Sequence, residues 1–181
     1  MSRLSVGDVM PNFLYATPFR SELSLEDTVR QVNGKTAIVF LRYFGCTLCQ
    51  LDLHTYAGAY DKITKNGGQL LVVLQSDPEG LAQQITPESF PYEIICDPEK
   101  KLYNELSVGS APSMLRMMSP GMVLKGIKAT AKGYKHGAYE GDELQLPAVF
   151  VMTPDRCLTH VHYGRDAGDV ATAKELAALL S

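Results

Sequence analysis

The sequence lacks three features that would place the protein in a special class. No apolar run reaches the length of a transmembrane helix, and residues 1–8 lack the apolar stretch of a signal peptide. Four cysteines in 181 residues are too few for a scaffold held together by disulfides. A net charge of −3 means no excess of basic residues, so neither nucleic acid nor a membrane is expected as a partner. These absences predict a cytoplasmic protein in a reducing environment.

What the sequence does contain is the composition of an ordinary folded chain. Apolar residues make up 45% of it and charged residues 20%, so the chain is neither disordered nor fibrous. A length of 181 residues suits one domain with a sizeable core. We therefore expect residues 1–181 to form a single domain.

A C-x-x-C motif, Cys46-Thr47-Leu48-Cys49, is the most informative segment of the chain. It follows an unbroken apolar run at residues 37–41, which is typical of a strand covered on both faces. After the motif, apolar residues recur at helical spacing: Leu53, Tyr56, Ala57, Tyr60 and Ile63. A strand that delivers two cysteines onto the first turn of a helix favours thiol redox chemistry, because the unpaired backbone N–H groups there stabilise a thiolate.

Metal binding is the alternative interpretation of the cysteine pair. A structural zinc site would need a second pair of ligands at metal spacing, whereas Cys96 and Cys157 are isolated. His160 and His162 share one face of an expected strand, but such a pair is more often part of a polar sheet face. We therefore expect no metal and no other cofactor, and we interpret the cysteine pair as redox-active.

The rest of the chain alternates between segments with strand and helix patterns. Strands are expected at residues 37–41, 69–75, 92–96, 148–152 and 157–163. Helices are expected at about residues 46–65, 77–85, 97–106 and 169–180. A β-α-β half followed by an antiparallel hairpin and a closing helix is the order of an α/β thioredoxin fold, a central mixed sheet flanked by helices. Its active site would lie at the carboxyl end of the strand that precedes the motif.

Residues 107–145 are long for a connection between a helix and a strand, so we expect a helical insertion before the C-terminal hairpin. One or two helices, broken at Ser119-Pro120-Gly121, would lie over the domain. The segment holds four methionines: Met114, Met117, Met118 and Met122. We expect them to pack as core beneath the insertion; the alternative is a pocket for an apolar substrate or a dimer contact. Lysines at three- and four-residue spacing predict one solvated basic face: Lys125, Lys128, Lys132 and Lys135.

A proline stands where the thioredoxin fold places one opposite the cysteines. Pro147 directly precedes the expected strand at residues 148–152. In that fold such a proline follows a cis peptide bond and faces the motif, so we expect a cis Leu146–Pro147 bond within a few ångströms of Cys46. The alternative is an ordinary trans proline at the start of a strand.

Segments spread over nearly the whole chain resemble one family. They are residues 6–13, 90–91, 96–99, 126–145 and 150–151, together with Phe44-Gly45-Cys46-Thr47. The last is similar to the peroxidatic loop of peroxiredoxins of the bacterioferritin-comigratory type. The set resembles peroxiredoxin-like proteins of the alkyl hydroperoxide reductase C/thiol-specific antioxidant family. The resemblance implies an antioxidant thiol oxidoreductase that reduces peroxides, an electron donor of thioredoxin or glutaredoxin type, and a homodimer.

Both cysteines have roles in this interpretation. Cys46 would be the nucleophile, with a lowered pKa and an exposed sulfur, and Cys49 would be the resolving thiol deeper in the first turn. The same pair is complete for exchange with a protein disulfide, in which Cys46 attacks and Cys49 releases the product. A third alternative is a non-catalytic thioredoxin-like module that binds a partner or handles a metal.

Three positions depart from the pattern that the resemblance implies. Tyr43 stands where peroxiredoxins have threonine or serine, and Val39 stands where they have proline. Gln145-Leu146-Pro147 occupies the place of a conserved arginine. Arg42, at the end of the strand before the motif, either supplies a substitute charge or reaches solvent. Loss of donors to the transition state predicts a slow peroxidase, unless Arg42 or Tyr43 compensates.

Overall fold

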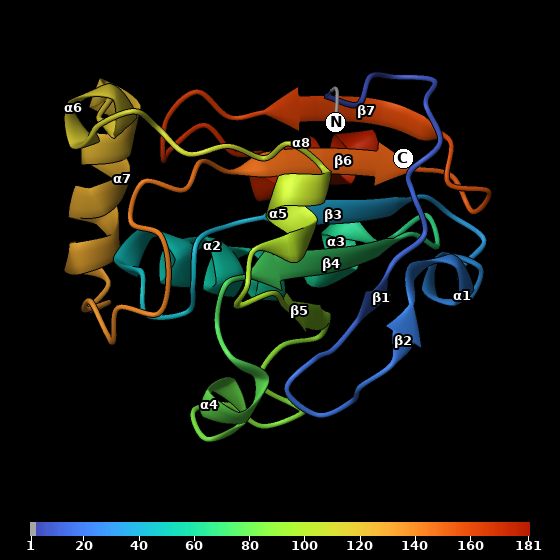
Figure 1. Cartoon of the computed structure of the whole chain (residues 1–181), viewed down its shortest axis with the longest axis horizontal. Helices are drawn as coiled ribbons and strands as arrows, with labels where there is room; N and C mark the ends of the chain where they lie inside the picture. Colours follow the sequence, from blue (N-terminus) through green and yellow to red (C-terminus); the bar gives the residue numbers. More distant parts are fainter. Residues whose placement is uncertain (1–2) are drawn as a thin grey trace.

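A five-stranded mixed sheet runs through the centre of the protein in the computed structural model, which describes residues 3–181 (Figure 1). In spatial order its strands are β5 (Glu93–Cys96), β4 (Gln69–Leu74), β3 (Thr36–Phe40), β6 (Ala148–Met152) and β7 (Leu158–Tyr163). The strands β3, β4 and β5 are parallel, whereas β6 runs antiparallel to both β3 and β7. All five expected strands are therefore confirmed, and the architecture is that of the thioredoxin fold.

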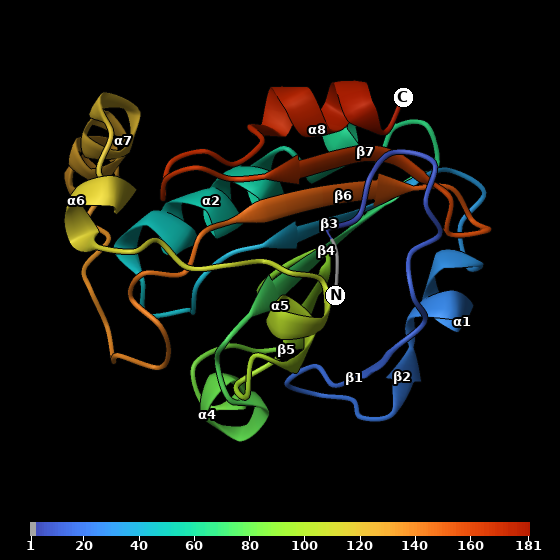
Figure 2. The same cartoon turned by 45° about the horizontal axis from the view of Figure 1, so that its top comes forward.

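Helices cover both faces of the sheet, which is why β3 is buried at all five positions (Figure 2). One face is covered by α2 (Thr47–Gly58), α3 (Tyr60–Ile63) and α8 (Ala173–Leu179). The other is covered by α1 (Leu25–Val29) and α5 (Lys101–Glu105). Successive strand residues point to opposite faces, so Ala37 and Val39 pack in the first core while Ile38 and Phe40 pack in the second.

Two smaller elements lie at the edge of the fold. The helix α4 (Pro78–Ala82) begins where the sequence predicts, because the Asp77 carboxylate accepts a hydrogen bond from the Gly80 N–H at 2.9 Å. A hairpin of β1 (Leu14–Tyr15) and β2 (Leu23–Ser24) was not expected, since a strand of two residues has no readable alternation. Within residues 3–181, no helix is both long and apolar enough to cross a bilayer.

The expected insertion holds two helices, α6 (Met114–Met117) and α7 (Pro120–Ala131), which stand together at one end of the molecule (Figures 1 and 2). The expected break is confirmed, because α7 begins at Pro120 and Ser119 Oγ accepts a hydrogen bond from the Met122 N–H at 3.1 Å. The helix α7 packs against α2. The insertion therefore reaches the helix that carries the motif.

Two expectations about the side chains of the insertion are wrong in part. Met117 is buried, but Met114 and Met118 are 55% and 54% exposed, because α6 lies at the rim rather than over the core. Lys125 does not join a solvated basic face. It is largely buried in an ion pair with Asp52 of α2, with 2.6 Å between Nζ and Oδ2. Packing of α7 on α2 turns this one lysine inward.

Candidate active site

Cys46 stands at the junction of the central strand and its helix, as the sequence predicts. After β3 the chain turns through residues 41–45, and Cys46 is the N-cap of α2. Its Sγ accepts a hydrogen bond from the backbone N–H of Cys49 at 3.3 Å. The sulfur thus pairs with an N–H group that the helix itself leaves free, and it lies at the positive end of the helix dipole.

Arg42 places a positive charge beside this sulfur. Its Nη2 donates a hydrogen bond to Cys46 Sγ at 3.0 Å, and its Nη1 donates one to the backbone oxygen of Glu143 at 2.8 Å. Only 12% of the Arg42 side chain is exposed. Of the two orientations considered for this arginine, the one that faces the thiol is therefore present.

The surroundings separate the pKa values of the two cysteines. A hydrogen bond from the Cys49 thiol, aided by the charge of Arg42, outweighs burial and lowers the pKa of Cys46 from 9.0 to about 6. Burial, and then the adjacent Cys46 sulfur, raise the pKa of Cys49 well above 9.0. At neutral pH this arrangement favours a thiolate on Cys46 and a thiol on Cys49.

The expectation that the Cys46 sulfur is exposed is wrong. Cys46 is 0% exposed and Cys49 is 4% exposed. The segment between α7 and β6, residues 132–147, is here called the covering segment. It packs directly against the loop of the motif, where the Gly137 N–H donates a hydrogen bond to the Gly45 oxygen at 2.8 Å. A Cβ atom on Gly45 would stand 2.3 Å from the backbone oxygen of Ala138, so this approach requires glycine at position 45.

Acidic side chains hold the covering segment in place. Glu140 Oε2 accepts hydrogen bonds from Ser76 Oγ at 2.6 Å and from the Gly45 N–H at 3.4 Å. Glu143 Oε2 lies 3.8 Å from Arg42 Nη1. Neither glutamate was predictable from the sequence, because Glu140 is 95 positions from Gly45 and Glu143 is 101 positions from Arg42, and no local spacing links them.

Tyr43 is fully buried, and its hydroxyl pairs with the covering segment. The hydroxyl lies 3.0 Å from His136 Nε2 in the covering segment, while the backbone oxygen of Tyr43 accepts a hydrogen bond from the Cys46 N–H at 3.2 Å. Among the residues that the structure describes, no hydrogen bond joins this hydroxyl to a cysteine sulfur. Tyr43 therefore does not replace the hydroxyl that peroxiredoxins carry at this position.

The prediction of a cis bond before Pro147 is wrong, since residues 3–181 contain no cis peptide bond. Pro147 nevertheless lies near Cys49. It lines a small cavity that is also lined by Cys49 and Arg42. The proline thus shares this cavity with Cys49, and its expected closeness to the Cys46 sulfur stays a prediction.

The remaining cysteines and histidines lie apart from this cluster. Cys96 ends β5, and burial together with nearby acidic groups raises its pKa to about 12, which makes it a poor nucleophile. His162 Nε2 lies 2.9 Å from Asp169 Oδ1, where it pairs with that carboxylate and not with a cysteine. Over residues 3–181, no group of three or more potential ligands among His, Cys, Asp and Glu is placed to hold a metal ion.

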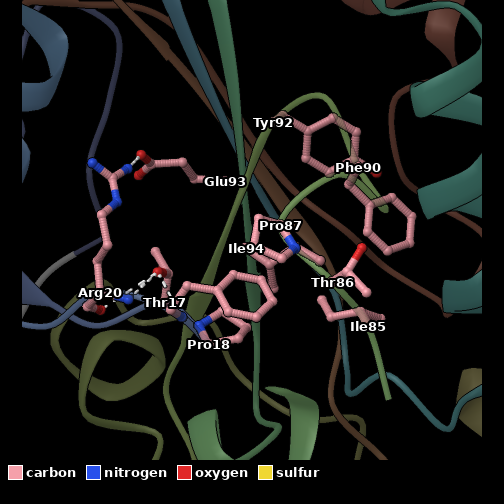
Figure 3. Close-up of a pocket in the computed structure, with 11 residues that line it drawn as sticks. Thr17, Pro18, Arg20, Ile85, Thr86, Pro87, Phe90, Tyr92, Glu93 and Ile94 are labelled. Atoms are coloured by element: carbon pink, nitrogen blue, oxygen red, sulfur yellow. Dashed lines mark hydrogen bonds and ion pairs between the residues drawn. The ribbon is translucent and has the colours of Figure 1, made fainter. Parts of the chain in front are cut away.

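A larger cavity of about 280 Å3 contains neither motif cysteine (Figure 3). The rings of Phe90 and Tyr92 form part of its wall, and Arg20 reaches across to form an ion pair with Glu93. This pairing neutralises the charge that an anionic ligand would need. We therefore place the chemistry at Cys46 rather than in this cavity.

Comparison with protein families identifies the family of this chain. A family model described as AhpC/TSA antioxidant enzyme matches residues 52–166, which is more than half of the chain. The chain belongs to the AhpC/TSA antioxidant enzyme family. The matched range begins after Cys49, so the identification rests on the body of the fold and not on the cysteine pair.

This AhpC/TSA protein is also similar to a curated protein. The prostamide/prostaglandin F synthase of Pongo abelii is 32% identical over 128 residues, which cover 66% of this chain and 62% of that protein. The chain therefore spans less than two thirds of the length of this curated relative.

Solved structures of peroxiredoxins share the fold. Peroxidoxin BcpB from Mycobacterium tuberculosis superposes with a TM-score of 0.70 at 13% identity and covers 98% of this chain and 97% of its own. A cysteine-to-serine mutant of peroxiredoxin 6 from Arenicola marina gives 0.68 at 16% identity, over 98% of this chain and 72% of that one. At these identities the likeness establishes the fold alone.

Proposed function

We propose that this AhpC/TSA family protein reduces a small peroxide with the thiolate of Cys46. One observation carries the proposal: Arg42 Nη2 lies 3.0 Å from Cys46 Sγ in a largely buried site. A guanidinium in that place stabilises the attacking thiolate. It also lies close to where negative charge develops on the peroxide oxygen, and can stabilise that charge. The resemblance to peroxiredoxins gives this task to an arginine that is absent here.

The first step oxidises Cys46. Its thiolate attacks one peroxide oxygen, so an S–O bond forms while the O–O bond breaks. The departing oxygen takes a proton and leaves as water or an alcohol, and Cys46 becomes a sulfenic acid. The lowered pKa of Cys46 favours this step, because only the thiolate is nucleophilic.

The second step closes the pair and prepares it for reduction. Cys49 loses its proton and attacks Cys46 Sγ, so an S–S bond forms, the S–O bond breaks and water leaves. A dithiol donor of thioredoxin or glutaredoxin type then returns both cysteines to thiols by disulfide exchange. Such a cycle suits the reducing cytoplasm, and the homodimer expected by family analogy stays a prediction.

Exchange with a protein disulfide is the second candidate. The C-x-x-C spacing suits it, but Cys46 is 0% exposed beneath the segment after α7. A folded substrate would have to displace that segment before its disulfide met the sulfur, whereas hydrogen peroxide is about as small as water. Burial therefore favours the small peroxide.

Donor-coupled turnover with hydrogen peroxide, an organic hydroperoxide and a protein disulfide tests the proposal. We expect oxidation of Cys46 by a peroxide to be faster than that of a free thiolate and to be lost in Cys46→Ser. The matched control is Cys157→Ser, which removes a thiol outside the site. A peroxide rate equal to that of a free thiolate, with turnover of the disulfide, would replace peroxide reduction by disulfide exchange. Inert thiols with bound zinc would indicate a metal-handling module.

A further inference from the structure

The resolving step needs a group that removes the proton of Cys49, and the surroundings of this thiol are unusual. Cys49 and Asp52 are three residues apart on α2, so their side chains lie on the same face of the helix, one turn apart. Both line the small cavity that Arg42 and Pro147 also line. A buried aspartate thus lines the same small cavity as the resolving thiol.

The volume of this cavity is about 10 Å3, which leaves room for the centre of one water molecule. Gln145 is 0% exposed and also lines the cavity. Its Nε2 donates to three backbone oxygens, those of Val108, Gly109 and Leu146, whereas its Oε1 has no hydrogen-bond partner. The three carbonyls fix the orientation of the amide, so the unpartnered atom is an acceptor.

We propose that Asp52 accepts the proton of Cys49 through one water molecule held in this cavity. Once Cys46 is a sulfenic acid, the Cys49 thiol no longer faces a Cys46 thiolate and is free to donate to the water. The water in turn donates one hydrogen bond to the Asp52 carboxylate and one to Gln145 Oε1. These three partners are the number that a buried water ordinarily has. The proposal rests on the roles given to Cys46 and Cys49 under the proposed function. It names the proton acceptor for Cys49, which the resolving step needs.

The step balances in atoms and charge. The proton of Cys49 passes to the water while a proton of the water passes to Asp52. The Cys49 thiolate attacks Cys46 Sγ of the sulfenic acid, the S–S bond forms, and the S–O bond breaks. The departing hydroxide takes a proton from solvent and leaves as water. Reduction of the disulfide by the dithiol donor reverses the relay, and Asp52 returns the proton to Cys49.

Lys125 gives Asp52 the charge state that the relay requires. Burial raises the pKa of Asp52, and the ammonium group of Lys125, 2.6 Å away, opposes that rise. The titratable groups facing Asp52 and Cys49 come from several elements: Lys125 on α7, Tyr56 on α2, Tyr92 before β5, and Arg42 and Cys46 in the motif loop. Among these, Lys125 is in direct contact with the carboxylate.

The test separates the two oxidation steps. After mixing with hydrogen peroxide, sulfenic acid on Cys46 is trapped with a cyclic diketone, and disulfide formation is followed by mass spectrometry. We expect Asp52→Asn to slow disulfide formation by roughly a hundredfold at pH 7, the size of a general-base contribution, and to leave sulfenic acid formation unchanged. The deficit should shrink as the pH rises, because hydroxide then removes the proton. Equal slowing of both steps, or none in the second, would overturn the proposal.

Three further variants keep the result interpretable. Asp52→Asn leaves Lys125 buried without a counter-charge, so the double variant Asp52→Asn/Lys125→Met repeats the test with no unpaired ion. Gln145→Leu keeps the ion pair but removes an acceptor of the water, and a smaller slowing of the same step is expected. Asp61→Asn, which changes an exposed aspartate on α3, is the matched control and should alter neither step.

A readout without peroxide distinguishes failure of the relay from failure of the proposed function. In the Cys46→Ser background, the rate at which iodoacetamide alkylates Cys49 is measured against pH. With Asp52→Asn added, we expect the profile to shift to lower pH, because loss of the neighbouring negative charge favours the Cys49 thiolate. A shift would support the relay even if peroxides prove not to be the substrate, and an unchanged profile would overturn it whatever the substrate.

Discussion

Two helices of twelve residues each, α2 and α7, pack against one another but differ in what covers their outer faces. The helix α2 is enclosed between the sheet and α7, and six of its residues are buried. The helix α7 has one buried residue, Ala129. Its outer face carries Val123, Leu124 and Ile127, which are 44%, 69% and 63% exposed.

This difference shows that apolar content alone does not tell a core helix from a surface helix. Enclosure holds the first turn of α2 in one place, and that is where a thiolate needs fixed donors. From α7 the site receives Lys125, the partner of Asp52, and the segment that follows α7 covers Cys46. We therefore expect substitutions to matter most where α2 is enclosed and least on the outer face of α7.

The largest effect is expected for Leu53→Ala in α2. The side chain is 0% exposed, so its removal leaves a cavity and should lower the free energy of unfolding by about 2–5 kcal/mol. Urea denaturation followed by circular dichroism measures the loss. The same substitution on the neighbouring helix, Leu124→Ala, is the matched control. Equal losses in the two variants would remove the distinction between the helices.

The next effect is expected for Arg42→Met, just before the start of α2. Loss of a charged donor should destabilise the Cys46 thiolate by about 1.5–3 kcal/mol. The pKa of Cys46 then rises from about 6 toward 9.0. Because the thiolate reacts, the wild type should reach its full alkylation rate soon above pH 6, and the variant only at higher pH. Iodoacetamide alkylation against pH measures this shift.

The control for that experiment is Arg165→Met, which removes an arginine whose side chain is 86% exposed. An identical pH profile in the Arg42 and Arg165 variants would mean that the charge beside the sulfur has no influence on its ionisation.

A smaller effect is expected for Tyr43→Phe. The change removes the hydrogen bond to His136, which should lower the free energy of unfolding by about 1 kcal/mol. The pKa of Cys46 should stay the same, because the hydroxyl pairs with His136 and not with the sulfur. Thermal unfolding and the alkylation profile test both parts. His136→Ala should reproduce the stability loss, and a shifted profile would show that Tyr43 acts on the thiolate after all.

The smallest effect is expected on the outer face of α7. Leu124→Ser should change the free energy of unfolding by no more than about 0.5 kcal/mol, because the side chain is already 69% exposed. Met117→Ser in α6 is the contrasting control, since that side chain is 1% exposed and its loss should be clearly larger. A large loss in Leu124→Ser would mean that a partner covers this face in solution.

Features that depend on near neighbours in the chain were predictable. Continuous apolar runs, turn residues and helical spacing identified the five strands and the motif helix, and Pro120 marked the start of α7. Features that depend on distant partners were not. The exposure of Cys46, the direction of the Tyr43 hydroxyl and the pairing of Lys125 each depend on a contact with a residue more than 70 positions away.

The sequence by itself determined that two cysteines stand at the start of a helix fed by a buried strand. Hydrogen bonds within one helical turn suffice for that, because they join residues close in the chain. Only the tertiary structure decided that Arg42 points at Cys46, that Gly137 and its neighbours bury the sulfur, and that Asp52 shares a cavity with Cys49. The reactivity of a thiol follows from the charges and donors around it in space, and chain folding brings these together from segments that no local pattern connects.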